Sequence, residues 1–275
     1  MATTLFDLRD SAFRRLALRI FRRVNPGDVT IRHHWTGDPV RLHSFKHKGY
    51  WWHGKRREQE TIEGFQRLIR PGDTVFEVGG HIGYLSLIYA NLVGAGGRVL
   101  VFEPGANNLP YLKRNIGPLR HVELVEKAVS DTSGTVTFWL EDLSGQNNSL
   151  IQDYHLLKGN IELAGLNNAV NKQAVTVQSV TLDDFIGASR PPAFVKIDVE
   201  GAELMVLCGA AGMLECRETV LMVEVTREAE AIHALFVGAG YRLFHADRRP
   251  VSSHETMVGN VFCLPHDEAV KRFLG

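Results

Sequence analysis

The sequence predicts an α/β fold in which a doubly wound, mostly parallel sheet follows an N-terminal helical and β extension. The first observation is the apolar run Val75–Val78, which is typical of a strand buried on both faces of a parallel sheet. The second is a glycine turn followed by apolar residues spaced three and four apart from Ile82 to Val93, as in a helix. The third is another apolar strand, 98–102, which ends in Glu103.

The remaining elements continue this alternation. Apolar patterns predict strands over 122–129, 134–140, 194–199 and 220–225, and helices over 111–116 and 202–213. Residues 141–173 interrupt the pattern with a polar, Asn-rich excursion that returns to the sheet through Val175–Val180. A long excursion inside a compact domain is usually functional or disordered. We therefore interpret residues 141–180 as a substrate-binding flap and keep a surface loop as the alternative.

Length and composition indicate a soluble enzyme with one large domain. With 275 residues, of which 44% are hydrophobic, the chain can bury one α/β core over residues 58–275. Lys and Arg total 31 and balance 31 acidic residues, so no positive field favours nucleic acid as a partner. Cys208, Cys216 and Cys263 lack C-x-x-C spacing, which predicts reduced core thiols and a cytoplasmic location. No secretory pattern and no run of about 18 apolar residues occurs.

The extension, residues 1–57, has two parts. Residues 5–24 place apolar side chains on one face of a helix and arginines on the other, which is a basic amphipathic pattern. We expect this helix to pack on the catalytic domain or on a second copy of the chain in a homo-oligomer, and contact with a membrane surface is the alternative. Residues 31–57 are rich in His, Trp and Tyr, which suits a small β appendage covering the active site.

The glycine turn points to a nucleotide-type cofactor. Gly79, Gly80 and Gly83 let the backbone approach a ligand, and Glu103 is placed to accept hydrogen bonds from both hydroxyls of a ribose. Three interpretations compete: a purely structural turn, a dinucleotide site and an S-adenosylmethionine site. The dinucleotide pattern G-x-G-x-x-G needs a glycine where Val78 stands. Because S-adenosylmethionine carries no phosphate, we favour it as the cofactor.

Five motifs follow one another between about residues 58 and 226. They are Glu77-x-Gly79-x-x-x-Gly83-Tyr84, Phe102-Glu103-Pro104, Ala128-Val129-Ser130-Asp131, Thr181-Leu182-Asp183-Asp184-Phe185 and Val195-Lys196-Ile197-Asp198-Val199-Glu200-Gly201-Ala202-Glu203. Together they resemble the FkbM family of S-adenosylmethionine-dependent O-methyltransferases. Where that family usually has Asp-x-Gly-Ala-Asn, this chain has Glu77, Gly80 and His81, which keeps the acid but replaces the asparagine.

The resemblance implies a class I methyltransferase fold, which is Rossmann-like and has seven strands. Residues 241–244 and 260–264 would form its closing antiparallel pair. It also implies a pocket for the cofactor. The residues expected there are Glu77, Gly79, Gly80, His81, Gly83, Tyr84, Glu103, Pro104, Asn107, Ala128, Val129 and Ser130.

The chemistry of an open α/β sheet belongs at the carboxyl ends of its strands. Asp198 is expected there, as the general base for an acceptor hydroxyl or as a ligand of a divalent ion, with capping of the next helix as the alternative. Glu224 ends the next strand and is the second expected catalytic residue. The two carboxylates would together suit Mg²⁺, which we keep as an additional cofactor hypothesis.

The predicted reaction is therefore transfer of a methyl group from S-adenosylmethionine to a hydroxyl of a saccharide, a glycoconjugate or a similar small molecule. Two alternatives stay open. The acceptor could be polyketide-like or another non-sugar molecule, or the chain could be a non-catalytic, cofactor-binding subunit that docks on a partner.

Overall fold

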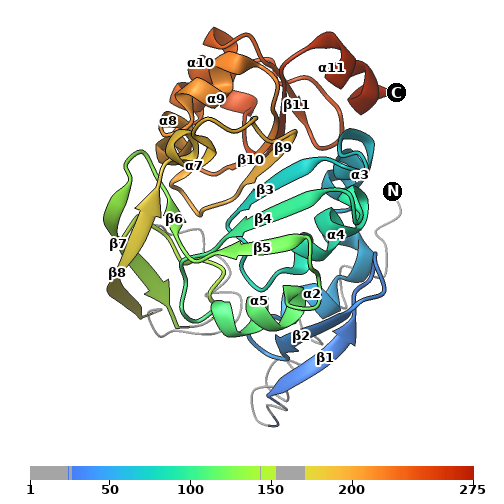
Figure 1. Ribbon diagram of the computed structural model, residues 1–275, viewed down its shortest axis with the longest axis vertical. Helices are drawn as coiled ribbons and strands as arrows, with labels where there is room; N and C mark the ends of the chain where they lie inside the picture. The colour runs from blue at the N-terminus through green and yellow to red at the C-terminus, as the bar shows by residue number, and fades with distance from the viewer. Residues whose placement is uncertain (1–23, 25–26, 143, 153–170) are drawn as a thin grey trace, which may run out of the picture.

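The computed structural model describes residue 24 and residues 27–142, 144–152 and 171–275 (Figure 1). The strands of its main sheet are β3 (Thr74–Val78), β4 (Arg98–Phe102), β5 (Val122–Val125), β9 (Phe194–Ile197), β10 (Val220–Val225), β11 (Arg242–His245) and β12 (Gly259–Leu264). The helices beside it are α3 (Gln59–Leu68), α4 (Tyr84–Val93), α5 (Leu109–Ile116), α7 (Leu182–Ile186), α8 (Glu203–Cys208), α9 (Ala211–Cys216), α10 (Ala229–Gly238) and α11 (Asp267–Leu274).

The main sheet has the strand order β11-β12-β10-β9-β3-β4-β5. All neighbouring strands are parallel except β12, which is antiparallel to both β10 and β11. The chain runs outward from β3 through β4 to β5 and later returns to β9 on the other side of β3, so the switch point of the sheet lies between β3 and β9. This arrangement confirms the predicted doubly wound, mostly parallel seven-stranded fold and its closing antiparallel pair.

Helices cover both faces of the sheet, so the core has two layers of apolar contacts. Helices α3, α4, α5 and α11 pack on one face, and α7, α8, α9 and α10 pack on the other. Along β3, Val75 belongs to the first layer while Phe76 and Val78 belong to the second, as expected for side chains that alternate across a strand. A strand covered on both faces explains why this segment is almost entirely apolar.

Two predicted elements are divided in the structure. The expected strand 122–129 ends at Val125, and Ala128–Val129 forms β6 in a separate sheet with β7 (Gly134–Glu141) and β8 (Lys172–Val180). The break falls at a tight turn in which Lys127 N donates to Val125 O at 2.8 Å. The expected helix 202–213 breaks at Gly209, whose carbonyl accepts a hydrogen bond from Asp183 N at 3.0 Å.

The described part of the extension packs closely on the α/β core. Strands β1 (Asp28–Arg32) and β2 (Pro39–His43) form an antiparallel pair, followed by α2 (Lys48–Trp52) and a 3-10 turn at Gly54–Arg56. The Asn115 side chain of α5 accepts from Arg41 N at 2.7 Å and donates to Arg41 O and Ile82 O. One amide therefore joins the appendage to the turn before α4. The predicted helix over residues 5–24 lies outside the described residues, Val24 excepted.

Two further sequence expectations concern the burial of the three cysteines and the absence of a membrane-spanning segment. Cys208 and Cys216 are exposed at the ends of α8 and α9, and Cys263 alone of the three cysteines is buried, so the prediction of three core thiols was wrong. Cys208 lies directly before the break at Gly209, and Cys216 is the last residue of α9. Within the part of the chain that the structure describes, no helix is long and apolar enough to cross a membrane.

Candidate active site

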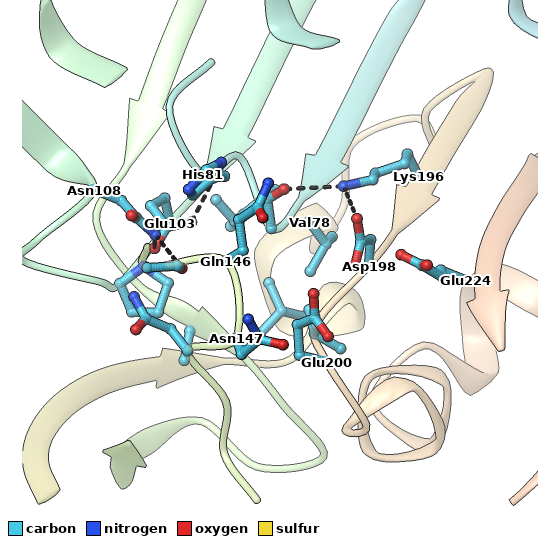
Figure 2. Close-up of a pocket in the computed structure, with 18 of the residues that line it drawn as sticks. Val78, His81, Glu103, Asn108, Gln146, Asn147, Lys196, Asp198, Glu200 and Glu224 are labelled. Atoms are coloured by element: carbon cyan, nitrogen blue, oxygen red, sulfur yellow. Dashed lines mark hydrogen bonds and ion pairs between the residues drawn. The ribbon is translucent and has the colours of Figure 1, made fainter. Parts of the chain in front are cut away.

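A cavity of about 330 Å³ lies where β3, β4, β9 and β10 end (Figure 2). Glu103 and Asn108 lie at one end of it, which we call the Glu103 end. Asp198 and Glu224 lie at the other, the Asp198 end, and Gln146 lies between the two. The residues predicted for the cofactor and those predicted for the acceptor thus share one cavity at the switch point of the sheet, where such folds bind ligands.

Glu103 follows β4 directly, and its side chain is held in place by three hydrogen bonds. Oε1 accepts from Gly105 N at 2.8 Å and from Asn108 Nδ2 at 3.2 Å, and Oε2 accepts from His81 N at 2.8 Å. A carboxylate has about four acceptor positions, so one is left for a ligand. Burial raises the pKa of Glu103 to about 7 in spite of these hydrogen bonds, which favour the ionised form.

Asn108 supplies a second acceptor at the Glu103 end. Its Nδ2 also donates to Gly145 O at 3.0 Å, whereas its Oδ1 is buried without a hydrogen-bond partner among the described residues. Because buried polar atoms are normally paired, Oδ1 and the remaining position on Glu103 fit a ligand with two donors. Phe102, Val129 and Phe138 supply apolar surface at the same cavity. Two acceptors beside apolar walls suit a ribose and a flat base, so these residues fit the adenosyl part of S-adenosylmethionine.

The turn after β3 brings two strands of the sheet into backbone contact. Gly79 has φ +89°, and a Cβ at this position would lie 1.9 Å from Asp198 O. Only glycine therefore fits at this point of the turn, where the backbone passes directly beside the end of β9. His81 follows with φ +48°, and Glu58 and Glu200, which also line the cavity, have φ +55°. Such conformations cost about 1–3 kcal/mol each in a non-glycine residue and cluster at functional sites.

Asp198 lies at the end of β9 in a network of charges. Its Oδ2 is 3.0 Å from the Lys196 ammonium, which also donates to Gly79 O at 3.0 Å. Figure 2 shows the contact between Lys196 and Asp198 as a dashed line. Glu224, on β10, shares a hydrogen bond with Asp198. Lys196 therefore links the turn after β3 to the carboxylate of Asp198, and the two carboxyl groups lie together at one end of the cavity.

The pKa values of the two carboxyl groups are shifted in opposite directions. The Asp198 charge, together with burial, raises the pKa of Glu224 to about 10, so Glu224 keeps its proton at neutral pH. It then donates a hydrogen bond to Asp198. Burial would raise the pKa of Asp198 as well, but the Lys196 ammonium and the hydrogen bond from Glu224 outweigh it and lower that pKa. Asp198 is thus the ionised acceptor of the pair and Glu224 is its neutral donor.

The appendage and the loop after β7 complete the cavity wall. Tyr50 OH and His81 Nδ1 are 2.9 Å apart, and the Arg57 guanidinium lies over the Tyr50 ring at 4.5 Å from its centroid. Burial lowers the pKa of His81 to about 3, so its imidazole is neutral. From the loop, Ser149 Oγ donates to Glu200 O at 2.7 Å. The described part of the predicted flap therefore contacts the segment after β9, and residues 153–170 of it lie outside the described residues.

Several predicted site residues line the cavity and several do not. Those in the lining are Gly79, His81, Glu103, Pro104, Ala128, Val129, Asp198 and Glu224. Those outside the lining are Glu77, Gly80, Gly83, Tyr84, Asn107 and Ser130. Glu77, Gly80, Gly83, Tyr84 and Ser130 are buried beside the cavity or only partly exposed, whereas Asn107 is exposed and pairs with Asn148, which lines it. Glu77 accepts a hydrogen bond from Ser86, and a Cβ at Gly80 would lie 2.2 Å from Val101.

Other cavity residues carried no motif in the sequence. Arg57 and Glu58 come from the segment before α3, Asn108 from the start of α5, and Asn260 from β12. Only the fold brings these residues together. The polar loop at Asn147 and Asn148 and the aromatic appendage around Tyr50 were the available signals, because both regions were expected to cover the site.

The described residues contain no cluster of three or more His, Cys, Asp or Glu side chains arranged to hold a metal ion. At the Asp198 end the Lys196 ammonium lies beside the carboxylate, in the position where a cation would neutralise it. The donors expected for Mg²⁺, Asp198 and Glu224, instead contact Lys196 and each other.

This strand order, with one antiparallel strand and a cavity at the switch point, is the class I methyltransferase fold, which is Rossmann-like. The sequence model described as "Methyltransferase FkbM domain" matches residues 77–243, which is more than half of the chain. The chain therefore belongs to the FkbM methyltransferase family. No curated protein sequence matches it.

Solved structures with similar folds include other methyltransferases. An FkbM methyltransferase from Methylobacillus flagellatus KT has a TM-score of 0.45 and 14% identity, and the similarity covers 74% of this chain and 50% of that one. The chain thus spans half the length of this structure. An S-adenosylmethionine-dependent O-methyltransferase from Thermotoga maritima has a TM-score of 0.41 and 10% identity, with 75% and 64% covered. Fibrillarin from Aeropyrum pernix, solved with S-adenosylmethionine, has a TM-score of 0.35 and 10% identity, with 72% and 68% covered.

Proposed function

We propose that the protein transfers a methyl group from S-adenosylmethionine to a hydroxyl of a saccharide or glycoconjugate. The observation that carries the proposal is the ionised Asp198 carboxylate, held by Lys196 and Glu224 in the same cavity as Glu103. Glu103, Asn108 and the Gly79 turn would hold the cofactor, and the Asp198 end would hold the acceptor. Asp198 remains a proposed catalytic residue, with Glu224 as its proposed partner.

Asp198 would act on the proton of the acceptor. S-adenosylmethionine supplies an activated methyl group, so the chain must align an oxygen behind it, and alignment can contribute roughly 7–11 kcal/mol. An alcohol gains acidity as its oxygen forms the new bond, and a carboxylate within reach then accepts the proton even when the pKa of that carboxylate is low. The lowered pKa of Asp198 keeps the side chain ionised and ready to accept. General-base assistance of this kind contributes about 10²–10⁴-fold to the rate.

The composition of the Asp198 end supports a polyhydroxylated acceptor. Besides Asp198 and Glu224, its lining includes Glu200, Asn260 and Arg57, which offer carboxylate, amide and guanidinium groups. Hydroxyl groups both donate and accept, so a sugar can pair with all three kinds of group at once. An apolar, polyketide-like acceptor could form hydrogen bonds with few of these groups, so the lining favours the saccharide.

We propose that Lys196, rather than Mg²⁺, supplies the cation beside Asp198. Lys196 is 2% exposed, and its ammonium already contacts both Asp198 and the Gly79 carbonyl. Methyl transfer should then persist after dialysis against EDTA. A loss of activity that returns with added Mg²⁺ would instead support a metal bound through Asp198 and Glu224.

The proposal is tested by cofactor binding followed by methyl transfer. Calorimetric titration should show binding of S-adenosylmethionine and S-adenosylhomocysteine but not of NAD, weakened by Glu103→Ala. Transfer of labelled methyl groups to a panel of glycans should then identify an acceptor, and Asp198→Asn should lower turnover about 10²–10⁴-fold while cofactor binding persists. Binding without transfer to any hydroxyl would favour a docking subunit, and transfer only to amines or to apolar alcohols would overturn the saccharide assignment.

A further inference from the structure

His81 lies where three elements that enclose the Glu103 end of the cavity meet. It belongs to the turn after β3, and its backbone N donates to Glu103 Oε2 at 2.8 Å. Its ring contacts the other two elements, because Nδ1 is 2.9 Å from Tyr50 OH of α2 and Nε2 is 3.3 Å from Ser144 O of the loop after β7. The imidazole therefore joins the appendage to the loop, and the backbone of the same residue holds the carboxylate that is expected to bind the ribose.

The direction of both ring contacts follows from the chemistry of the partners. A carbonyl oxygen only accepts, so Nε2 of His81 carries the hydrogen and donates a hydrogen bond to Ser144 O. Burial lowers the pKa of His81 to about 3, so the ring is neutral and its Nδ1 carries no hydrogen. Burial raises the pKa of Tyr50 to about 12, so the phenol keeps its proton and donates a hydrogen bond to Nδ1. Both ring nitrogens are thus used within the protein, in a chain that runs from Tyr50 to Ser144.

Residues 144–149 of the loop, which we call the strap, form one wall of the cavity. Asn108 Nδ2 donates to Gly145 O at 3.0 Å, which holds the start of the strap. Ser149 Oγ donates to Glu200 O at 2.7 Å, which holds its end beside the segment after β9. The strap residues that line the cavity are Gly145, Gln146, Asn147 and Asn148 (Figure 2).

The appendage holds the strap at further points. Tyr50 shares a hydrogen bond with the side chain of Gln146, and His47 shares one with the backbone of Ser144. The Tyr50 hydroxyl can serve both His81 and Gln146, because a hydroxyl has one donor and two acceptor positions. Opening of the strap therefore requires that contacts with the appendage break as well.

The backbone of His81 depends on these contacts. Its φ is +48°, in the left-handed region, which costs free energy in a residue with a side chain. That cost is comparable with the free energy that two neutral hydrogen bonds contribute. Loss of the contact with Tyr50 or with Ser144 should therefore let the backbone relax and turn the His81 N–H away from Glu103.

We propose that His81 is a positioning residue of the cofactor site, through which Tyr50 and the closed strap hold Glu103 in the orientation that binds a ribose. Coupling between two sites is reciprocal, so a ribose at Glu103 should in turn hold the strap closed. This inference rests on the proposed function, since it takes Glu103 as a ligand of S-adenosylmethionine. It gives the appendage a part in cofactor binding, beyond that of covering the active site.

Tyr50→Phe removes one hydroxyl, keeps the ring and tests the coupling. Calorimetric titration of the full chain with S-adenosylhomocysteine should give an affinity about three- to tenfold lower than that of the wild type, which corresponds to the loss of one hydrogen bond. In the background of Glu103→Ala, Tyr50→Phe should have little further effect, because Tyr50 acts on the cofactor through Glu103. A change that merely loosens the fold would instead add to the effect of Glu103→Ala.

Two further measurements follow the strap and the reaction. S-adenosylhomocysteine should slow hydrogen exchange of the amides of residues 144–149 in the wild type, and slow it less in Tyr50→Phe. In turnover, Tyr50→Phe should raise KM for S-adenosylmethionine by about the same factor as the affinity falls, while kcat is kept.

Tyr111→Phe is the matched control. The Tyr111 hydroxyl also joins the appendage to the core, since it donates to Asp28 Oδ1 of β1 at 2.7 Å, but Tyr111 lies outside the cavity lining. This variant should bind S-adenosylhomocysteine as the wild type does, and melting curves should show that all variants are folded.

Four results overturn the coupling. They are wild-type affinity in Tyr50→Phe, an equal loss of affinity in Tyr111→Phe, additive effects of Tyr50→Phe and Glu103→Ala, and a strap whose exchange is slowed equally in wild type and Tyr50→Phe. A fall in kcat with KM unchanged would also contradict it. No binding of S-adenosylhomocysteine by the wild type overturns the coupling together with the cofactor site, whereas binding without methyl transfer counts against the proposed function alone.

Discussion

At the scale of single residues, the proposed catalytic pair, Asp198 and Glu224, should decide how activity depends on pH. Glu224, with its pKa raised to about 10, donates a hydrogen bond to Asp198 at neutral pH. Above that pKa both groups are charged, and their repulsion should displace Asp198 from the acceptor. We expect kcat/KM of the wild type to fall as pH rises through about 10. Glu224→Gln keeps a donor that does not titrate, so its profile should stay flat there, and an identical fall in both enzymes would contradict the pairing.

Lys196 is the residue that joins the cofactor turn to the proposed base. Lys196→Met removes the donor to Gly79 O and leaves the Asp198 carboxylate without its cation. Breaking a fully buried ion pair costs about 3–5 kcal/mol, and because the Asp198 side chain is 28% exposed we expect a smaller loss of stability. S-adenosylmethionine should bind more weakly, and the acid limb of the pH profile should move to higher pH. Urea unfolding and calorimetry check both effects.

Lys113→Met is the control for Lys196, because the Lys113 ammonium pairs at the surface with Glu126 and both side chains are about half exposed. An exposed pair contributes about 0–1 kcal/mol, so this variant should keep stability, cofactor affinity and pH profile. If Lys196→Met behaves like Lys113→Met in all three measurements, Lys196 does not couple the turn to Asp198.

At the scale of elements, the turn between β3 and α4 depends on a glycine at one position. Gly79→Ala places a Cβ 1.9 Å from Asp198 O and also strains a residue at φ +89°. Gly72→Ala is a matched control, since Gly72 has φ +90° and nothing lies within 4 Å of its added Cβ. Gly72→Ala should cost about 1–2 kcal/mol, the strain alone. Gly79→Ala should cost roughly 1–3 kcal/mol more in urea unfolding and should abolish cofactor binding. Equal costs would mean that no close approach exists.

Elements near the motifs could be predicted because their signals are local. The run Val75–Val78, the glycines after it and Glu103 identify a strand, a turn and a carboxylate at the next strand end without knowledge of the rest of the chain. The break of the strand at Val125 and of the helix at Gly209 could not be predicted, because both depend on pairing with β8 or with Asp183, distant in sequence. Arg57 and Asn260 were missed for the same reason. Their place in the cavity is set by packing of α3 and β12.

At the scale of the whole molecule, buried carboxyl groups should make stability fall as the solution becomes alkaline. Burial raises the pKa of Glu77, Glu103 and Glu203 to about 7, and the Asp198 charge raises that of Glu224 to about 10. The unfolded chain releases these protons near pH 4.5, so above that pH the folded protein binds more protons than the unfolded chain. Its free energy of unfolding then decreases with pH until each folded pKa is passed.

Buried histidines act in the opposite direction over a lower range of pH. Burial lowers the pKa of His33 and His47 to about 4 and that of His81 to about 3. The unfolded chain binds protons at these sites below about pH 6.5, so this contribution increases stability as pH rises from about 4 to 6.5. The two groups of residues therefore oppose each other in weak acid. Above pH 7, only the Glu224 contribution continues to change.

We therefore expect a maximum of stability near pH 5, where the four carboxyl and three histidine contributions nearly cancel, and a decline that starts above it and continues between pH 7 and 10. One extra proton in the folded state corresponds to a slope on the order of 1 kcal/mol per pH unit. Urea unfolding of the wild type and of Glu224→Gln at several pH values measures this slope of the free energy of unfolding. The variant should lose most of the slope above pH 7, whereas Glu215→Gln, at an exposed carboxylate of α9, should keep it. A slope that persists in Glu224→Gln would show that the carboxyl group beside Asp198 does not hold its proton in the folded protein.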